Sequence, residues 1–217
     1  MAAEAELTPI ECVYHRRMEG SLDVSAFILA GGNSTRMGAD KAFLEYQGRT
    51  LLARALDLAR SVASDVCVVG SREKFAAFAP VVEDVFRDCG PLGGIHAALL
   101  ASRTELNVML AVDTPHISTA FLQYLIRQAC EAPDAAVVVA RAGGGWQPLC
   151  AVYRPEFAKV AEHALGAGRN RIDPLFGMVR TRVVEESELE HANFPTGLFR
   201  NLNTPEEWKE QERAAGG

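Results

Sequence analysis

The chain has 217 residues, of which 48% are hydrophobic and 23% charged, and its formal net charge at pH 7 is −6. This length suits one α/β domain with a sizeable core. The negative charge argues against nucleic acid or an anionic membrane as a partner, and no run of about 18 apolar residues predicts a transmembrane helix. An anionic substrate would therefore have to be bound locally, by a few placed cations.

The N-terminal segment, residues 1–22, shows no clear periodicity, and we interpret it as an extension or a poorly ordered arm. It carries acidic residues where a signal peptide would be basic and has no apolar core, which favours a cytoplasmic location. The five cysteines are odd in number and widely spaced, without a C-x-x-C pair. This pattern predicts reduced, mostly buried thiols rather than a disulfide or metal site.

The most informative stretch is residues 26–41, AFILAGGNSTRMGADK. Its apolar start predicts a short buried strand. Its glycines, together with Arg36 and Lys41, predict a phosphate-binding loop, because glycine lets the backbone approach a ligand and successive N–H groups form an anion-binding concavity. The spacing fits neither the Walker A loop nor the G-x-G-x-x-G fingerprint. The alternative is a plain strand–turn–helix junction with exposed charges.

Strands and helices alternate along the rest of the chain. Apolar runs predict strands at 65–70, 81–85, 107–112, 135–140, 147–153 and 181–184. Helical periodicity and capping signals predict helices at 51–59, 72–78, 95–102, 121–130 and 155–165, with Thr50 as the N-cap of the first. The alternation predicts a three-layer α/β domain with a mostly parallel sheet.

Two further features lie next to predicted strands. The loop Gly90-Pro91-Leu92-Gly93-Gly94 should open the helix from Ile95, whose N-terminus favours an anion. Asp113 follows a buried strand, at the edge where open α/β sheets bind ligands. Mg²⁺ takes one or two carboxylates plus phosphate oxygens, so Asp113 is the candidate metal ligand. Alternatively, the Gly-rich loop is only a connection that starts a helix, and Asp113 only caps the next helix, although Ser118 is available as that cap.

Together these motifs resemble the molybdenum cofactor guanylyltransferases, the MobA family of nucleotidyltransferases. The resemblance spans residues 24 to about 210 and rests on four elements in family order: LAGGNSTRMGADK, GPLGG, QPLCAVYRPEF and the N-x-N-T-P-E-E at 201–207. It implies a three-layer Rossmann-like fold, dependence on Mg²⁺, and transfer of GMP from GTP to molybdenum-molybdopterin with release of pyrophosphate. Cofactor-delivery proteins and molybdoenzymes would be further partners.

The resemblance also implies roles for particular residues in a single nucleotidyltransferase domain covering residues 23–217. Its N-terminal half would bind GTP and its C-terminal half molybdopterin. The residues with a catalytic role would be Arg36, Lys41 and Asp113, the last also as the metal ligand. The residues that contact GTP would be Leu29, Ala30, Gly31, Lys41, Asp84 and Asp113. The residues that contact molybdopterin would be Gln147, Arg171, Asn201 and Asn203.

Some of these assignments leave alternatives open. Asp88 lies close enough to Asp84 to be the nucleotide contact instead, and Gly70-Ser71 stands where the family often has Asn. A related nucleotidyltransferase could use CTP or a sugar-phosphate acceptor. The cytidylyl relatives typically show an Ala-Gly loop and a Pro-Lys, and Gly32 and Asp40 in this chain favour GTP. The third alternative is a non-catalytic GTP-binding or cofactor-carrier protein.

Overall fold

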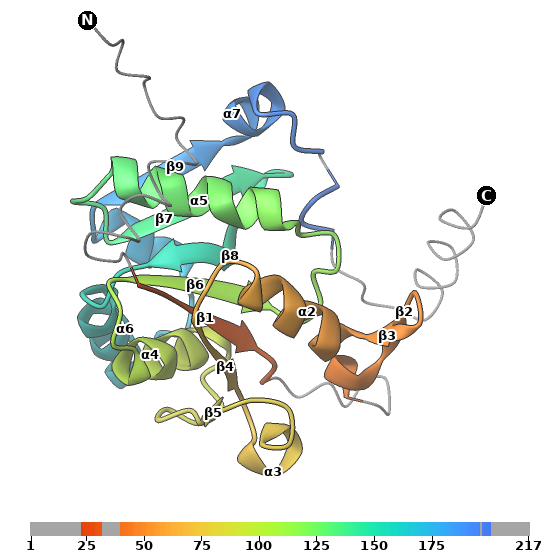
Figure 1. The fold of residues 1–217 in the computed structure, drawn as a ribbon. Coiled ribbons are helices and arrows are strands. Elements are labelled where there is room, and N and C mark those ends of the chain that lie inside the picture. Colours follow the sequence, from red (N-terminus) through yellow and green to blue (C-terminus); the bar gives the residue numbers. More distant parts are fainter. Residues whose placement is uncertain (1–22, 32–39, 196, 201–217) are drawn as a thin grey trace, which may run out of the picture.

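The computed structural model describes residues 23–31, 40–195 and 197–200. The N-terminal extension therefore lies outside the described residues. Within these ranges a seven-stranded sheet has the order β5-β4-β1-β6-β8-β7-β9, as Figure 1 shows. The strands are β1 Val24–Leu29, β4 Asp65–Val69, β5 Val81–Val82, β6 Leu106–Ala111, β7 Val137–Ala142, β8 Gly145–Tyr153 and β9 Thr181–Glu185. A separate two-stranded ribbon pairs β2 Glu45–Tyr46 with β3 Arg49–Thr50.

The sheet is mostly parallel, as the alternation of strands and helices predicts. Only β8 runs against its neighbours β6 and β7, while the other paired strands of this sheet are parallel. Gly143 and Gly144, at φ 60° and 77°, form the tight turn that joins β7 to β8. Two consecutive positive φ values suit the right-handed twist of a hairpin, and glycine adopts them without strain.

Helices cover both faces of the sheet (Figure 1). On one face α2 Leu51–Arg60 and α5 Thr119–Glu131 pack on Ala26 and Ile28 of β1 and their neighbours. On the other face α4 Pro91–Ala101 and α6 Phe157–Gly166 pack on Phe27 and the strands beside it. The alternation of side chains along β1 thus divides the core into two layers. The remaining elements are η2 Lys41–Phe43, α3 Arg72–Phe75, η3 Asp173–Gly177 and α7 Glu186–His191.

The local capping signals are confirmed. The side chain of Thr50 accepts a hydrogen bond from the backbone N–H of Ala53 at 3.2 Å and starts α2. The side chain of Ser118 accepts one from the N–H of Phe121 at 3.3 Å and starts α5. Because Ser118 is the N-cap of α5, the alternative in which Asp113 only caps that helix is wrong.

Three predicted boundaries are wrong by three residues or more. Helix α4 begins at Pro91 rather than Ile95, so most of the expected Gly-rich loop is the first helical turn. Proline is suited to that position because its fixed φ is helical and its missing N–H has no partner there. Helix α3 ends at Phe75, and strand β5 spans only Val81–Val82 because it pairs with β4 alone.

The four cysteines in the described part of the chain are free thiols. Cys150 is buried, and burial raises the pKa of its thiol. Cys67, Cys89 and Cys130 are only half-buried, so the expectation of mostly buried thiols is wrong for them. No helix within the described ranges has both the length and the apolar character needed to span a membrane.

Candidate functional site

A cavity of about 220 Å³ lies at the carboxyl edge of the sheet. Strands β1, β4 and β6 end there in register, with Leu29 paired to both Val69 and Ala111. The start of α4 forms another side of the cavity. The lining residues are Leu29, Ala30, Gly31, Asp40, Lys41, Val69, Asp84, Gly90, Pro91, Gly94, Ala111, Val112, Asp113 and Leu149. Parallel sheets of this kind bind ligands at this edge.

Lys41 and Asp113 meet in this cavity although they are 72 positions apart in the chain. The Nζ atom of Lys41 lies 3.0 Å from Oδ2 of Asp113, and the two side chains are 24% and 20% exposed. Asp113 leaves the sheet just after β6, and the hydroxyl of Thr114 donates to the carbonyl of Ala111 at 2.8 Å to fix that turn. A cation and a carboxylate in one partly enclosed cavity suit a ligand that carries both phosphate and a divalent ion.

Asp40 holds Lys41 in place. One carboxylate oxygen of Asp40 accepts a hydrogen bond from the N–H of Ala42 at 3.1 Å and caps the short helix η2. The other oxygen pairs with Lys74 of α3 at 2.8 Å. The sequence analysis gave Asp40 no such role, and the signal for it was the capping preference of Asp one residue before a helix.

Asp84 faces the cavity from the loop after β5. Its Oδ1 atom is buried and has no hydrogen-bond partner among the described residues. Burial raises the pKa of this carboxyl above its usual value. Asp88 is not part of the cavity lining and has a positive φ of 58°. The geometry therefore favours Asp84 over Asp88 as a ligand contact, and an unpartnered acceptor there suits a ligand with N–H or O–H donors.

Two glycines allow α4 to approach the strand ends closely. A Cβ atom on Gly94 would lie 3.3 Å from side-chain atoms of both Leu29 and Val69. A Cβ atom on Gly93 would lie 2.9 Å from the backbone oxygen of Phe86, which is closer than Cβ atoms approach other heavy atoms in proteins. The GPLGG segment therefore brings the positive end of α4 against the cavity, where its dipole favours an anion.

Gln147 and Arg171, the two predicted acceptor-side residues that the structure describes, do not line this cavity. The side-chain nitrogen of Gln147 donates to the carbonyl of Ala142 at 3.1 Å and so supports the hairpin turn. Arg171 is 83% exposed and lies 3.8 Å from the carboxylate of Asp173. Leu149 of β8 does line the cavity, and the sequence analysis missed it because an apolar strand residue carries no chemical signal. The remaining predicted positions, Arg36, Asn201 and Asn203, lie outside the described residues.

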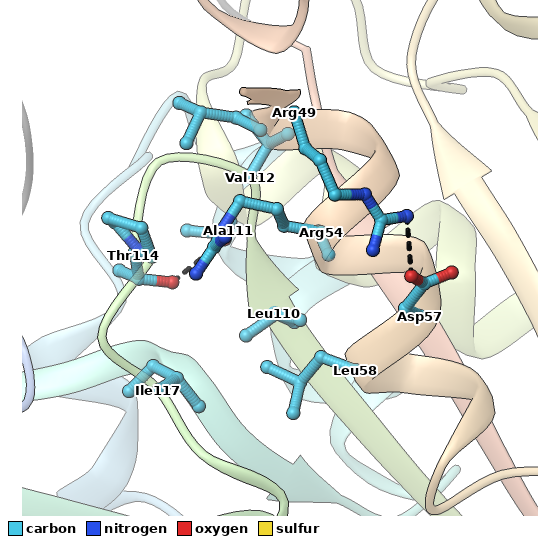
Figure 2. A pocket seen from close by; sticks show the side chains of 12 residues that line it. Arg49, Arg54, Asp57, Leu58, Leu110, Ala111, Val112, Thr114 and Ile117 are labelled. Carbon is cyan, nitrogen blue, oxygen red and sulfur yellow. Dashed lines mark hydrogen bonds and ion pairs between the residues drawn. The ribbon is translucent and has the colours of Figure 1, made fainter. Parts of the chain in front are cut away.

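A second cavity, of about 230 Å³, lies between α2 and the segment that follows β6 (Figure 2). Arg54 reaches across it in Figure 2, and Arg49 pairs with Asp57 at 2.6 Å on its rim. The guanidinium of Arg54 stacks over the ring of Tyr46 at 5.2 Å. Ala111 and Val112 line both cavities, but none of the predicted site residues within the described ranges lines this second one.

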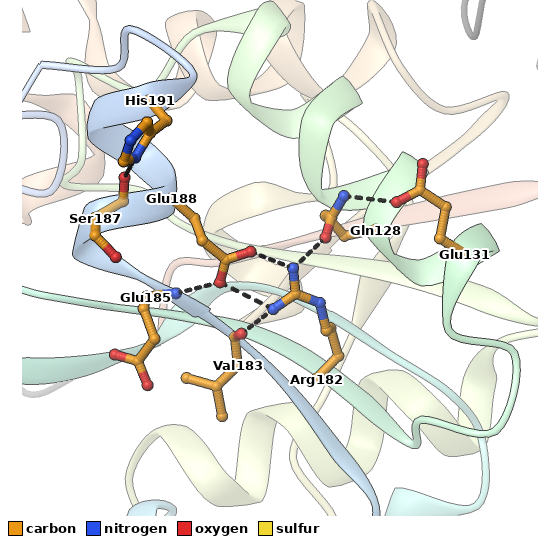
Figure 3. Close-up of polar contacts among 8 residues, drawn as sticks. All are labelled: Gln128, Glu131, Arg182, Val183, Glu185, Ser187, Glu188 and His191. Carbon is orange, nitrogen blue, oxygen red and sulfur yellow. Dashed lines mark hydrogen bonds and ion pairs between the residues drawn. The ribbon is translucent and has the colours of Figure 1, made fainter.

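A cluster of charged groups joins β9 and α7 to α5 (Figure 3). Nη1 of Arg182 donates to Oε1 of Glu188 at 3.0 Å, and the same guanidinium bonds Gln128. Glu188 also accepts from the N–H of Glu185 at 3.0 Å, which completes a capping box at the start of α7. The bond from Arg182 lowers the pKa of the Glu188 carboxyl. Each charge has a partner, so this cluster fastens the C-terminal strand to the rest of the sheet.

Comparison with known proteins gives a consistent result. Residues 26–177 match the family model described as "MobA-like NTP transferase domain". The chain is 33% identical, over 89% of its length and 92% of the relative, to a molybdenum cofactor guanylyltransferase from Syntrophotalea carbinolica. It is 36% identical to another from Pseudomonas entomophila, over 84% and 94% of the two chains. A crystal structure of molybdopterin-guanine dinucleotide biosynthesis protein A from Archaeoglobus fulgidus shares the fold, with a TM-score of 0.75, 23% identity, and coverage of 88% and 98%.

Proposed function

This chain belongs to the family of MobA-like NTP transferases, and from that premise we propose that it transfers GMP from GTP to molybdenum-molybdopterin. The products are the molybdopterin guanine dinucleotide cofactor and pyrophosphate. The observation that carries this proposal is the meeting of Lys41 and Asp113 at 3.0 Å inside a cavity that the two described ends of LAGGNSTRMGADK and the GPLGG segment also line.

The nucleotide occupies the 220 Å³ cavity. The backbone at Leu29, Ala30 and Gly31 faces the base, and the unpartnered carboxylate oxygen of Asp84 accepts a hydrogen bond from the nucleoside. Guanine presents two adjacent N–H donors, which a carboxylate can accept together. This pairing supports GTP as the nucleotide.

The reaction is an in-line displacement. An oxygen of the acceptor phosphate attacks the α-phosphorus of GTP, the bond from that phosphorus to the bridging oxygen breaks, and pyrophosphate departs with the bonding electrons. Lys41 stabilises the charge that grows on the departing group, and the N-terminus of α4 adds partial positive charge. Catalysis of this kind depends mainly on positioning and on neutralising charge.

Mg²⁺ is the metal ion that this function implies, and the donor set fits it. Asp113 supplies a hard carboxylate oxygen at the cavity wall. The described residues contain no group of three or more His, Cys, Asp or Glu side chains that could enclose a metal. An ion held by one or two carboxylates and completed by phosphate oxygens and water needs no such group. When bound, Mg²⁺ would neutralise phosphate charge and so lower the repulsion between nucleotide and acceptor.

The test is a reconstituted reaction with the full chain. Pyrophosphate release and labelled dinucleotide are measured with each of the four NTPs, with and without molybdenum-molybdopterin and with and without Mg²⁺. We expect product only when GTP, the acceptor and Mg²⁺ are present together. Preference for CTP, activity with a sugar phosphate in place of the pterin, or GTP binding without pyrophosphate release would each contradict the proposal and identify one of the alternatives.

We also infer that the enzyme works in the cytoplasm, where a cofactor-biosynthesis enzyme of this family would find GTP. Its product would then pass to cofactor-delivery proteins or directly to molybdoenzymes. Fractionation of cells that express the full chain with a small C-terminal tag would test the location, and recovery in the periplasmic fraction would contradict it.

A further inference from the structure

The hairpin of β7 and β8 extends past the end of β6 at the carboxyl edge of the sheet. The last pair between β6 and β8 joins Leu110 to Cys150. The pairing of β7 with β8 continues beyond this point through Arg141 opposite Trp146 to Ala142 opposite Gly145. At about 3.3 Å per residue, residues 145–149 project roughly 15 Å past that last pair. The hairpin therefore forms a wall beside the nucleotide cavity, on the C-terminal half of the sheet.

Arg141 and Trp146 form a stacked pair on this hairpin. The Cζ atom of Arg141 lies 5.5 Å from the centroid of the Trp146 ring. The ring of Trp146 is held from the protein side by Phe176 of η3, at 4.9 Å between centroids. Trp146 is half-buried, whereas Arg141 is exposed. The aromatic contact thus fixes the indole, and the indole holds the guanidinium of Arg141 over its face at the surface.

The pair and the nucleotide cavity lie on the same face of the sheet. Trp146 and Leu149 both pack against the core layer that contains Leu29 and Val69, and Leu149 lines the cavity. Neighbouring strands are about 4.8 Å apart, so β7 is on the order of 10 Å from β6, which delivers Asp113. A flat molecule with its phosphate near Asp113 would therefore extend its rings toward Arg141 and Trp146.

We propose that Arg141 and Trp146 form the platform that holds the fused rings of the phosphorylated pterin acceptor. The rings stack on the guanidinium plane of Arg141, and its N–H groups donate to anionic oxygens at the edge of the acceptor. Trp146 is a positioning residue that orients Arg141. A guanidinium suits both tasks because it is planar, permanently charged and rich in donors. The inference rests on the proposed function, and it adds a specificity determinant for the acceptor rather than for GTP.

The chain offers a direct readout of this contact. It has two tryptophans, Trp146 and Trp208, and Trp208 lies outside the described residues. In a Trp208→Phe background, the fluorescence of Trp146 alone is followed while molybdopterin is added. We expect saturable quenching by the acceptor and little change with GTP.

Kinetics of Arg141 variants complete the test. We expect Arg141→Ala to raise the KM for the acceptor about tenfold, which corresponds to about 1.4 kcal/mol, while the KM for GTP and the kcat stay within about twofold. Arg141→Lys should rescue only partly, because an ammonium group keeps the charge but does not stack. The matched control is Arg127→Ala, which removes a similar pair, Arg127 over Tyr124 at 5.8 Å on α5, and should leave both KM values unchanged.

Three outcomes would overturn the inference. The first is Trp146 fluorescence that does not respond to molybdopterin in an enzyme that turns over. The second is an unchanged acceptor KM, or equal increases in both KM values, in a folded Arg141→Ala variant. The third is a wild-type chain that neither binds molybdopterin nor transfers GMP to it, and this result alone would also remove the proposed function.

Discussion

The substitution Asp113→Asn tests the centre of the proposed site, because it removes the charge of the carboxylate and keeps its shape. Lys41 Nζ and Asp113 Oδ2 are 3.0 Å apart, and both side chains are mostly shielded from solvent. At this distance and an effective dielectric constant of about 20, their direct attraction is about 5.5 kcal/mol. Desolvation of both groups opposes most of that attraction. We therefore expect the free energy of unfolding to fall by only about 1 kcal/mol.

The effect on transfer should be much larger. Without the carboxylate, the site loses the proposed ligand for Mg²⁺ and the ion-pair partner of Lys41. We expect the rate of GMP transfer to fall about 10³-fold, which corresponds to about 4 kcal/mol of activation free energy. Initial rates of pyrophosphate release at saturating GTP and acceptor measure this loss, and thermal unfolding followed by circular dichroism confirms that the variant is folded.

A matched control separates the site from ion pairing in general. Asp134 pairs with Arg180 at 3.1 Å, a similar distance, but outside the cavity and with both side chains largely exposed. Asp134→Asn should keep the wild-type rate. A folded Asp113→Asn variant that retains more than about a tenth of that rate would refute the mechanistic role of Asp113.

Three further substitutions make separate predictions. Asp84→Asn should weaken GTP binding about tenfold in calorimetry, since it removes a charged acceptor. The same variant should not have a lower midpoint of thermal unfolding, because burial raises the pKa of the Asp84 carboxyl, so its ionisation at neutral pH opposes folding. A lower midpoint would contradict this reasoning. Gly93→Ala should lower the free energy of unfolding in urea by about 1–3 kcal/mol, since its Cβ would lie 2.9 Å from the oxygen of Phe86; an unchanged midpoint would show that the loop adapts. Glu188→Gln should reduce stability at pH 7 by about 0.5–1 kcal/mol. Arg182 lowers the pKa of the Glu188 carboxyl in the folded state, so the ionised carboxylate stabilises the fold above the usual carboxyl pKa of 4.5. This stabilisation is lost as the pH falls through the lowered pKa. A difference in unfolding free energy between wild type and variant that persists in acid would rule out this explanation.

Some features of the fold are encoded by a few neighbouring residues, so the amino-acid sequence is enough to predict them. Thr50 and Ser118 were identified as helix caps, and both make the expected backbone hydrogen bonds. The strand before Gly31 and the strand before Asp113 were identified from short apolar runs. Such signals depend on the type and spacing of a few neighbouring residues, and these do not change with the rest of the fold. The motifs in family order also indicated the function, because each contains several chemically specific residues.

Other features depend on contacts between distant parts of the chain, and these are visible only in the folded molecule. Lys41 and Asp113 were separate candidates until the parallel order of β1 and β6 placed them 3.0 Å apart. Asp84 lines the cavity and Asp88 does not, and this difference depends on how the loop after β5 folds, because the two residues are of the same type. The stacking of Arg141 on Trp146 follows from the register of the β7–β8 hairpin and from Phe176 beneath it. Sheet order, register and packing arise from long-range burial of apolar surface, which local sequence patterns do not specify.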